Sequence, residues 1–115
     1  MDLPLTIQQI GLYTVVEFRT ASLMDTTVLD DINEHLCRLV DEQDQRRIIL
    51  DFEQVEYLSS RAIGLVLTLN KRLAALSRSK LVLCGVGPRL MELLKITALD
   101  RLLTVKRSQA EAMKV

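Results

Sequence analysis

The chain has 115 residues, and 49% of them are apolar, which is enough to form the hydrophobic core of one domain. Lys and Arg together equal Asp and Glu at 15 each, so no excess of positive charge favours nucleic acid or an anionic membrane. Aromatic residues make up 3% and Trp is absent, which argues against a surface that stacks bases. We predict one domain over residues 1–115 that binds neither nucleic acid nor a membrane.

The amino-terminal stretch MDLPLTIQQIG lacks the apolar core of a signal peptide, and no stretch approaches the roughly 18 apolar residues of a membrane span. These features predict a cytoplasmic protein. Cys37 and Cys84 each lie in an apolar run, which is typical of reduced, buried cysteines. His35 is close to Cys37, but two residues are too few for a zinc site. We predict no metal and no cofactor.

The first predicted elements are a hairpin and a helix. LTIQQIGLYTVVEF, residues 5–18, has strand character, and Gly11 can supply the tight turn within it. RTASLMDTT follows and is predicted to be a loop. Asp25 or Thr26 then caps a helix, because its side-chain oxygen can accept a free amide hydrogen. The apolar residues of this helix recur at helical spacing: Val28, Leu29, Ile32, Leu36, Leu39 and Val40.

Two short apolar runs, RIILDF at 47–52 and KLVLCG at 80–85, are typical of strands that are covered on both faces of a sheet. Between them, YLSSRAIG at 57–64 leads into the long apolar helix LVLTLNKRLAAL. Pro88 suits the first turn of another helix, TVKR at 104–107 predicts a last short strand, and a small frayed helix is expected from about residue 108. The alternation of strands and helices predicts an α/β fold with a mixed, mostly parallel sheet and about four helices.

The common enzyme motifs are incomplete. CGVGPRL places glycines between a strand and a helix, but it lacks the full dinucleotide-binding motif. A serine hydrolase needs a base beside its nucleophile, and the one histidine, His35, falls on a different predicted helix from Ser59 and Ser60. The two serines also lack the flanking glycines of a nucleophile elbow. We therefore predict no catalytic residue and no enzyme activity.

Asp51, Ser59 and Ser60 are the polar residues that stand out. Asp51 ends a strand at the carboxyl edge of the sheet, where parallel sheets usually place functional groups; alternatively, it accepts hydrogen bonds from loop amides. Either Ser59 or Ser60 can cap the helix that follows. The positive end of that helix also favours negative charge, so the fold would tolerate a phosphate there.

Four segments carry a resemblance to a known family: IILDFEQVEYLSS, RAIGLVLTLNKRL, KLVLCGV and PRLMELLKITALDRLL. With the hairpin and first helix, nearly the whole chain resembles a STAS domain, the family of anti-sigma factor antagonists. The resemblance implies helices packed mainly on one side of the sheet. It also implies partner switching that regulates transcription indirectly. The unmodified domain binds an anti-sigma factor that is a serine kinase, phosphorylation separates the two proteins, and a PP2C-like phosphatase resets the switch.

The resemblance also implies roles for individual residues. It assigns the phosphoacceptor to Ser60, with Ser59 as the second candidate. Three residues depart from the family pattern, because Ser59 replaces an acid, Arg61 a small residue and Ala62 a glycine. The partner-binding residues implied are Asp25, Asp51, Ser59, Ser60, Arg61 and Gly64.

Two other functions stay open. The chain could be a constitutive interaction subunit of a transporter or signalling assembly, in which Ser59 and Ser60 only cap the helix. It could instead be a small hydrolase, and Ser60→Ala would then abolish turnover of ester substrates.

Overall fold

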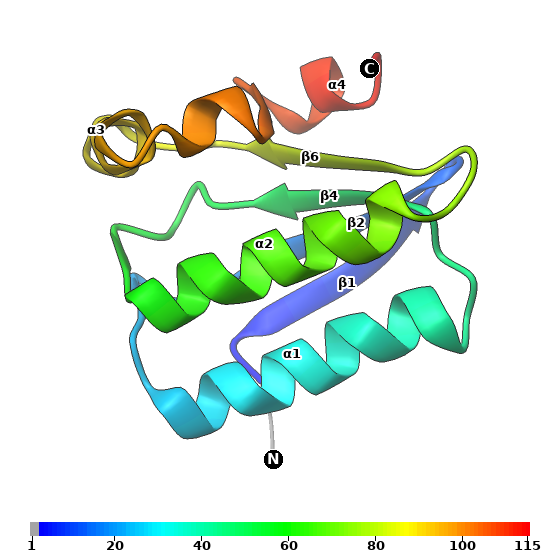
Figure 1. Ribbon diagram of the computed structural model, residues 1–115, viewed down its shortest axis with the longest axis horizontal. Helices are drawn as coiled ribbons and strands as arrows, with labels where there is room; N and C mark the ends of the chain where they lie inside the picture. The colour runs from blue at the N-terminus through cyan, green and yellow to red at the C-terminus, as the bar shows by residue number, and fades with distance from the viewer. Residues whose placement is uncertain (1–2) are drawn as a thin grey trace.

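The computed structural model describes residues 3–115 (Figure 1). Met1 and Asp2, the first two residues of the stretch MDLPLTIQQIG, lie outside the described residues. The main elements appear in the predicted order: β1 (Leu5–Ile10), β2 (Tyr13–Phe18), α1 (Thr26–Asp41), β4 (Arg47–Asp51), α2 (Ser60–Ala74), β6 (Lys80–Cys84), α3 (Pro88–Ile96), β7 (Thr104–Lys106) and α4 (Gln109–Ala112). A 3₁₀ turn, Leu99–Arg101, follows α3.

The strands form a mixed sheet, which confirms the predicted fold class. Within residues 3–115 the main sheet has five strands in the order β1-β2-β4-β6-β7. β1 and β2 are antiparallel, whereas the other neighbouring pairs are parallel. β4 lies at the centre, and its residues Ile48, Ile49 and Leu50 are fully buried, as expected for a strand covered on both faces.

The helices divide unequally between the two faces of the sheet. α1, α2 and α3 bury their apolar residues against one face, together with Val16, Ile48 and Leu50. Figure 1 shows α1 and α2 running side by side along the sheet. The other face is covered by α4 and the last residues, which pack on Tyr13, Val15, Ile49, Val82 and Cys84. The expectation that helices pack mainly on one side is therefore confirmed.

A second, two-stranded sheet was not predicted. β3 (Ser22–Leu23) lies in the segment RTASLMDTT and pairs in parallel with β5 (Tyr57–Leu58). The prediction that RTASLMDTT is a loop is therefore wrong at Ser22 and Leu23. Two-residue strands are too short to show an alternating pattern, so no periodicity predicts them.

The two cysteines differ in burial. Cys84 is 1% exposed, as predicted, but Cys37 is only partly buried, so the prediction of a buried Cys37 is wrong. Cys37 lies on α1 at the border between its buried and exposed faces, where its thiol contacts Asn33 Oδ1 at 3.8 Å. In the part of the chain that the structure describes, no helix is long and apolar enough to cross a membrane.

Candidate functional site at the start of helix α2

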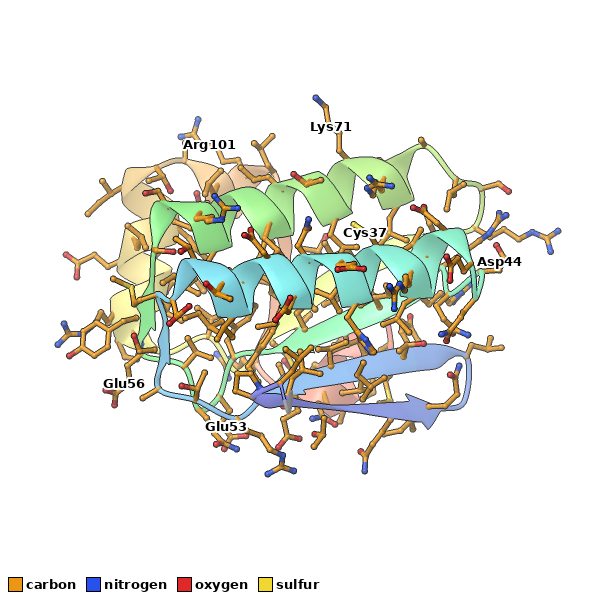
Figure 2. The ribbon with its side chains drawn as sticks, turned by 90° about the horizontal axis from the view of Figure 1, so that it is seen from below. Cys37, Asp44, Glu53, Glu56, Lys71 and Arg101 are labelled. Atoms are coloured by element: carbon orange, nitrogen blue, oxygen red, sulfur yellow. The ribbon has the colours of Figure 1, made fainter. Side chains whose placement is uncertain are left out.

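The small sheet of β3 and β5 holds the starts of two helices together. Leu23 pairs with Leu58, and the Ser59 amide donates to the Leu23 carbonyl at 3.2 Å. α1 begins three residues after Leu23, and α2 begins two residues after Leu58. The amino-terminal ends of α1 and α2 therefore lie side by side, and Figures 1 and 2 show the two helices running in parallel.

Ser59 and Ser60 have different surroundings. Ser59 has an extended backbone and is the N-cap of α2, since its hydroxyl accepts a hydrogen bond from the Ala62 amide at 3.1 Å. Ser60 is the first helical residue, its side chain is exposed, and its hydroxyl has no hydrogen-bond partner among residues 3–115. Ser59 is thus the capping serine, and Ser60 carries the free hydroxyl.

Asp25 caps the neighbouring helix. Its carboxylate accepts hydrogen bonds from the amides of Thr27 at 2.9 Å and Val28 at 3.1 Å, and this assigns the cap to Asp25 rather than Thr26. Asp25 is exposed, so its charge lies on the same end of the molecule as Ser60. The structure therefore places Asp25, Ser59 and Ser60 at the same end of the molecule, beside the small sheet of β3 and β5.

Arg61 and Gly64 line a groove between α1 and α2. The Arg61 guanidinium forms an ion pair with Asp30 of α1, and both side chains are more than half exposed. Gly64 faces open space, because a Cβ added there would meet no other atom within 4 Å. The groove has a volume of about 280 Å³ and is lined by Leu29, Asp30, Asn33, Arg61, Gly64, Leu65 and Thr68.

Exposed apolar and aromatic side chains flank the serines, and sequence analysis missed them. Met24, after β3, is 52% exposed, and Tyr57, in β5, is 44% exposed. The guanidinium of Arg89, from the first turn of α3, lies 4.8 Å from the centre of the Tyr57 ring, which is a cation–π contact. Tyr57 and Met24 could have been noticed as large residues beside the serines. Arg89 and Asp30 lie far from them in sequence and gave no signal.

Asp51 is separated from the other predicted site residues. It is 4% exposed; one carboxylate oxygen accepts from the Glu53 amide at 2.9 Å and the other from the Gln109 side chain of α4 at 2.6 Å. Gly85, in the left-handed region at φ +67°, lies against it, since a Cβ on Gly85 would be 2.8 Å from the carboxylate. This placement fits the alternative that Asp51 accepts loop amides, and it does not fit direct contact with a partner.

Cys84 is the buried titratable neighbour of Asp51. Burial, with a smaller effect of the negative charges of Asp51, Glu53 and Glu17, raises the pKa of the Cys84 thiol from 9.0 to about 12. The thiol is therefore protonated at neutral pH, and a protonated, buried thiol is a poor nucleophile.

His35 does not form a catalytic pair with Ser60. It lies on the exposed side of α1, in a shallow hollow lined by Leu3, Asp31, Glu34 and Arg38. Among the described residues, neither serine donates a hydrogen bond to a base. The hydrolase alternative therefore gains no support from the structure.

What the start of α2 offers chemically is a free hydroxyl beside unpaired amides. The amides of Ser60 and Arg61 have no acceptor within residues 3–115, because the first amides of a helix have no partner in the preceding turn. Unpaired amides and the positive end of the helix dipole stabilise an anionic group.

Comparison with protein families shows which family the chain belongs to. The family model of the STAS domain matches residues 6–112. The chain belongs to the STAS domain family.

Solved STAS structures share the fold at low sequence identity. An anti-sigma factor antagonist (STAS) domain protein from Planctomyces limnophilus is 22% identical, with a TM-score of 0.83 over 97% of this chain and 96% of that chain. An anti-sigma factor antagonist from Mycobacterium paratuberculosis is 14% identical, with a TM-score of 0.82 over 96% of this chain and 90% of that one. The Bacillus cell fate determinant SpoIIAA in its phosphorylated form is 17% identical, with a TM-score of 0.74 over 96% of both chains.

Proposed function

We propose that this STAS domain is an anti-sigma factor antagonist that binds an anti-sigma factor acting as a serine kinase, and that phosphorylation of Ser60 ends the binding. The observation that carries the proposal is the free, exposed hydroxyl of Ser60 at the start of α2, next to a serine whose hydroxyl already caps the helix. The similarity to SpoIIAA, which exists in an unphosphorylated and a phosphorylated form, supports this function.

The reaction would leave the fold unchanged. The kinase would transfer the γ-phosphoryl group of Mg-ATP to Ser60 Oγ; the hydroxyl proton passes to a base on the kinase, and ADP leaves. A PP2C-like phosphatase would hydrolyse the ester and return the serine and inorganic phosphate. The free amides at the start of α2 would stabilise the phosphate, so the modification changes surface charge without unfolding the helix.

Charge explains how the phosphate would end binding. A phosphoserine adds about −1.5 to −2 charge at neutral pH. The same end of the molecule already carries the exposed carboxylate of Asp25, while the charge of Asp30 is paired with Arg61. The positive charge of Arg89, which lies on Tyr57, offsets that of Asp25 before modification. The added charge would therefore turn a balanced surface negative, and a partner that fits the unmodified surface would be repelled.

The proposed interface surrounds Ser60. It comprises the predicted residues Asp25, Ser59, Ser60, Arg61 and Gly64, and the structure adds Met24 and Tyr57 as exposed side chains next to them. Tyr is a residue type enriched at the centres of interfaces. Asp51 is left out because its carboxylate is buried beneath α4.

A phosphorylation and binding experiment tests the proposal. The chain is mixed with candidate anti-sigma factor kinases and Mg-ATP, affinity is measured by calorimetry, and the phosphate is mapped by mass spectrometry. We expect phosphate on Ser60 in the wild type and in Ser59→Ala, and none in Ser60→Ala. Ser60→Asp should weaken binding about tenfold or more, which corresponds to about 1.4 kcal/mol. Thr104→Asp, which adds the same charge on exposed β7, should leave affinity unchanged.

Two results would contradict the proposal. Equal affinity of Ser60→Asp and the wild type would show that the start of α2 is not the interface. Tight binding without phosphate on Ser60 or Ser59 would rule out the switch and favour a constitutive interaction subunit.

A further inference from the structure

Strand β1 forms one edge of the main sheet and leaves that edge open. All six of its residues pair in continuous register with β2, from Leu5 opposite Phe18 to Ile10 opposite Tyr13. Figure 2 shows β1, in violet, at the border of the molecule, with no helix or strand of the described chain beyond its outer side. The residues at its carboxyl end, Gln8, Gln9 and Ile10, are exposed.

The two edges of the sheet are protected very differently. Natural sheets avoid unwanted pairing by short edge strands, charged side chains, prolines or bulges. The opposite edge, β7, has three residues, ends at Lys106 and is followed by Arg107. β1 is twice as long, has no bulge, and lies within ten residues, 3–12, that carry no charge. The proline of this segment, Pro4, comes just before the strand, and its carbonyl accepts a hydrogen bond from the Arg19 amide at 2.7 Å. Beyond Pro4, β1 thus has the hydrogen-bonding groups of an edge strand without the usual protection.

Apolar side chains at the hairpin tip accompany this open edge. Leu12, in the turn between β1 and β2, is 74% exposed, and Ile10 is 39% exposed. Hydrogen-bonding capacity along β1 and apolar surface at its end together indicate a surface that pairs with another extended strand.

We propose that the free edge of β1 pairs antiparallel with β1 of a second copy of this chain, so that the two main sheets become one. A twofold axis perpendicular to the sheet relates the two strands, and the contact is isologous. The antiparallel direction brings the exposed hairpin tip of each copy, with Ile10 and Leu12, towards the start of the partner's β1.

Charge favours a second copy over a charged peptide. The chain has a net charge of zero, so two copies do not repel one another at long range. The uncharged segment 3–12 also places no like charges opposite each other across the axis. β1 contains none of the residues of the proposed kinase interface, so the pairing is independent of the phosphorylation switch.

Analytical ultracentrifugation of the whole chain over a range of concentrations tests the pairing. We expect a monomer–dimer equilibrium that Gln8→Lys weakens about fivefold or more, because the twofold axis brings the two lysines near each other. The matched control is Thr104→Lys, which adds the same charge on exposed β7 and should leave the dissociation constant unchanged. Urea unfolding confirms that both variants remain folded.

Hydrogen exchange provides a second measurement. Amides of β1 that are not bonded to β2 should exchange more slowly as concentration rises in the wild type, and this effect should disappear in Gln8→Lys. A monomer at every concentration, whether or not β1 binds another extended peptide, overturns the proposal. So does a dimer that Thr104→Lys weakens as much as Gln8→Lys.

Discussion

Ser59 and Ser60 are chemically identical neighbours with different tasks, and the difference comes from backbone conformation. Ser59 is extended, so its hydroxyl reaches the Ala62 amide, whereas Ser60 is already helical and its hydroxyl forms no hydrogen bond with residues 3–115. The sequence could not distinguish the two, because serine is equally suited to the cap at either position. Because α2 begins at Ser60, the Ser59 hydroxyl is used as the cap and the Ser60 hydroxyl stays free for modification.

Substitution of each serine by alanine should separate capping from exposure. Ser59→Ala removes the cap and should lower the free energy of unfolding by about 1 kcal/mol. Ser60→Ala removes an exposed hydroxyl and should change it by less than about 0.5 kcal/mol. Urea unfolding at neutral pH measures both. Equal losses, or a larger loss for Ser60→Ala, would show that the helix begins one residue later than in the structure.

The direction of the Asp51 side chain could not be predicted from the sequence. The run RIILDF is apolar on both faces of the sheet, so no alternation in the sequence shows which way Asp51 points. The structure directs it to the face covered by α4, and its partner Gln109 lies 58 residues further along the chain. The other predicted partner-binding residues all lie at or near the starts of two parallel helices: Asp25, Ser59, Ser60, Arg61 and Gly64.

At the scale of elements, α1 and α2 form a parallel pair that is tied at several points. The β3–β5 sheet joins their starts, Asp30 pairs with Arg61, and Asp41 pairs with Arg72 at 2.8 Å near the other end. Exposed ion pairs contribute little to stability, so the apolar residues beneath the two helices hold the pair together.

Gly64 is the position in this pair where stability and binding should conflict. A glycine inside a helix costs about 0.5–1 kcal/mol relative to alanine, and here a Cβ would meet open space. Gly64→Ala should therefore raise the free energy of unfolding by about that amount, while the added methyl narrows the groove and should weaken binding of the proposed anti-sigma factor partner. Unfolding curves and calorimetry measure the two effects.

Gly87→Ala is the matched control for Gly64→Ala. It also adds a methyl to open space, but it lies before α3 and outside the groove, so affinity should not change. Unchanged affinity of Gly64→Ala would show that the partner does not approach this part of α2.

The order and type of the main elements could be predicted from the sequence, because the spacing of apolar residues decides which face of each element is buried in the core. Helices with a buried stripe and strands with continuous apolar runs were recognisable in this way. β3 and β5 were not, since their pairing depends on bringing residue 22 next to residue 57, a tertiary contact that no local pattern encodes.

On the scale of the whole molecule, the two faces of the sheet have unequal cover. Three helices protect one face, and a four-residue helix with its neighbours protects the other. Ala112 is fully buried there, and Tyr13 donates a hydrogen bond to the Val115 carbonyl at 2.9 Å. The thiol of Cys84 is buried on this face, beneath α4 and the last residues, and unfolding would expose it.

Stability should fall at alkaline pH because of Cys84. The folded state keeps the thiol proton up to its pKa of about 12, whereas the unfolded chain loses it near 9.0, so the contribution is complete below pH 9 and is lost as pH rises towards 12. At pH 10 the loss should be about 1.4 kcal/mol. The difference in unfolding free energy between wild type and Cys84→Ala, measured from pH 8 to 10, isolates this effect. A difference that does not change with pH would contradict it, and Cys37→Ala serves as the control.

The β3–β5 pairing has a further consequence for how an enzyme would recognise Ser60. The serine is held at the start of a helix by a strand that comes from more than thirty residues earlier in the chain. A short synthetic peptide around Ser60 would have the same local sequence, but it would lack the folded conformation and the neighbouring residues Met24, Asp25 and Asp30. A kinase or phosphatase that acts here must therefore read a folded surface, and scanning for a linear consensus sequence would overlook such a substrate.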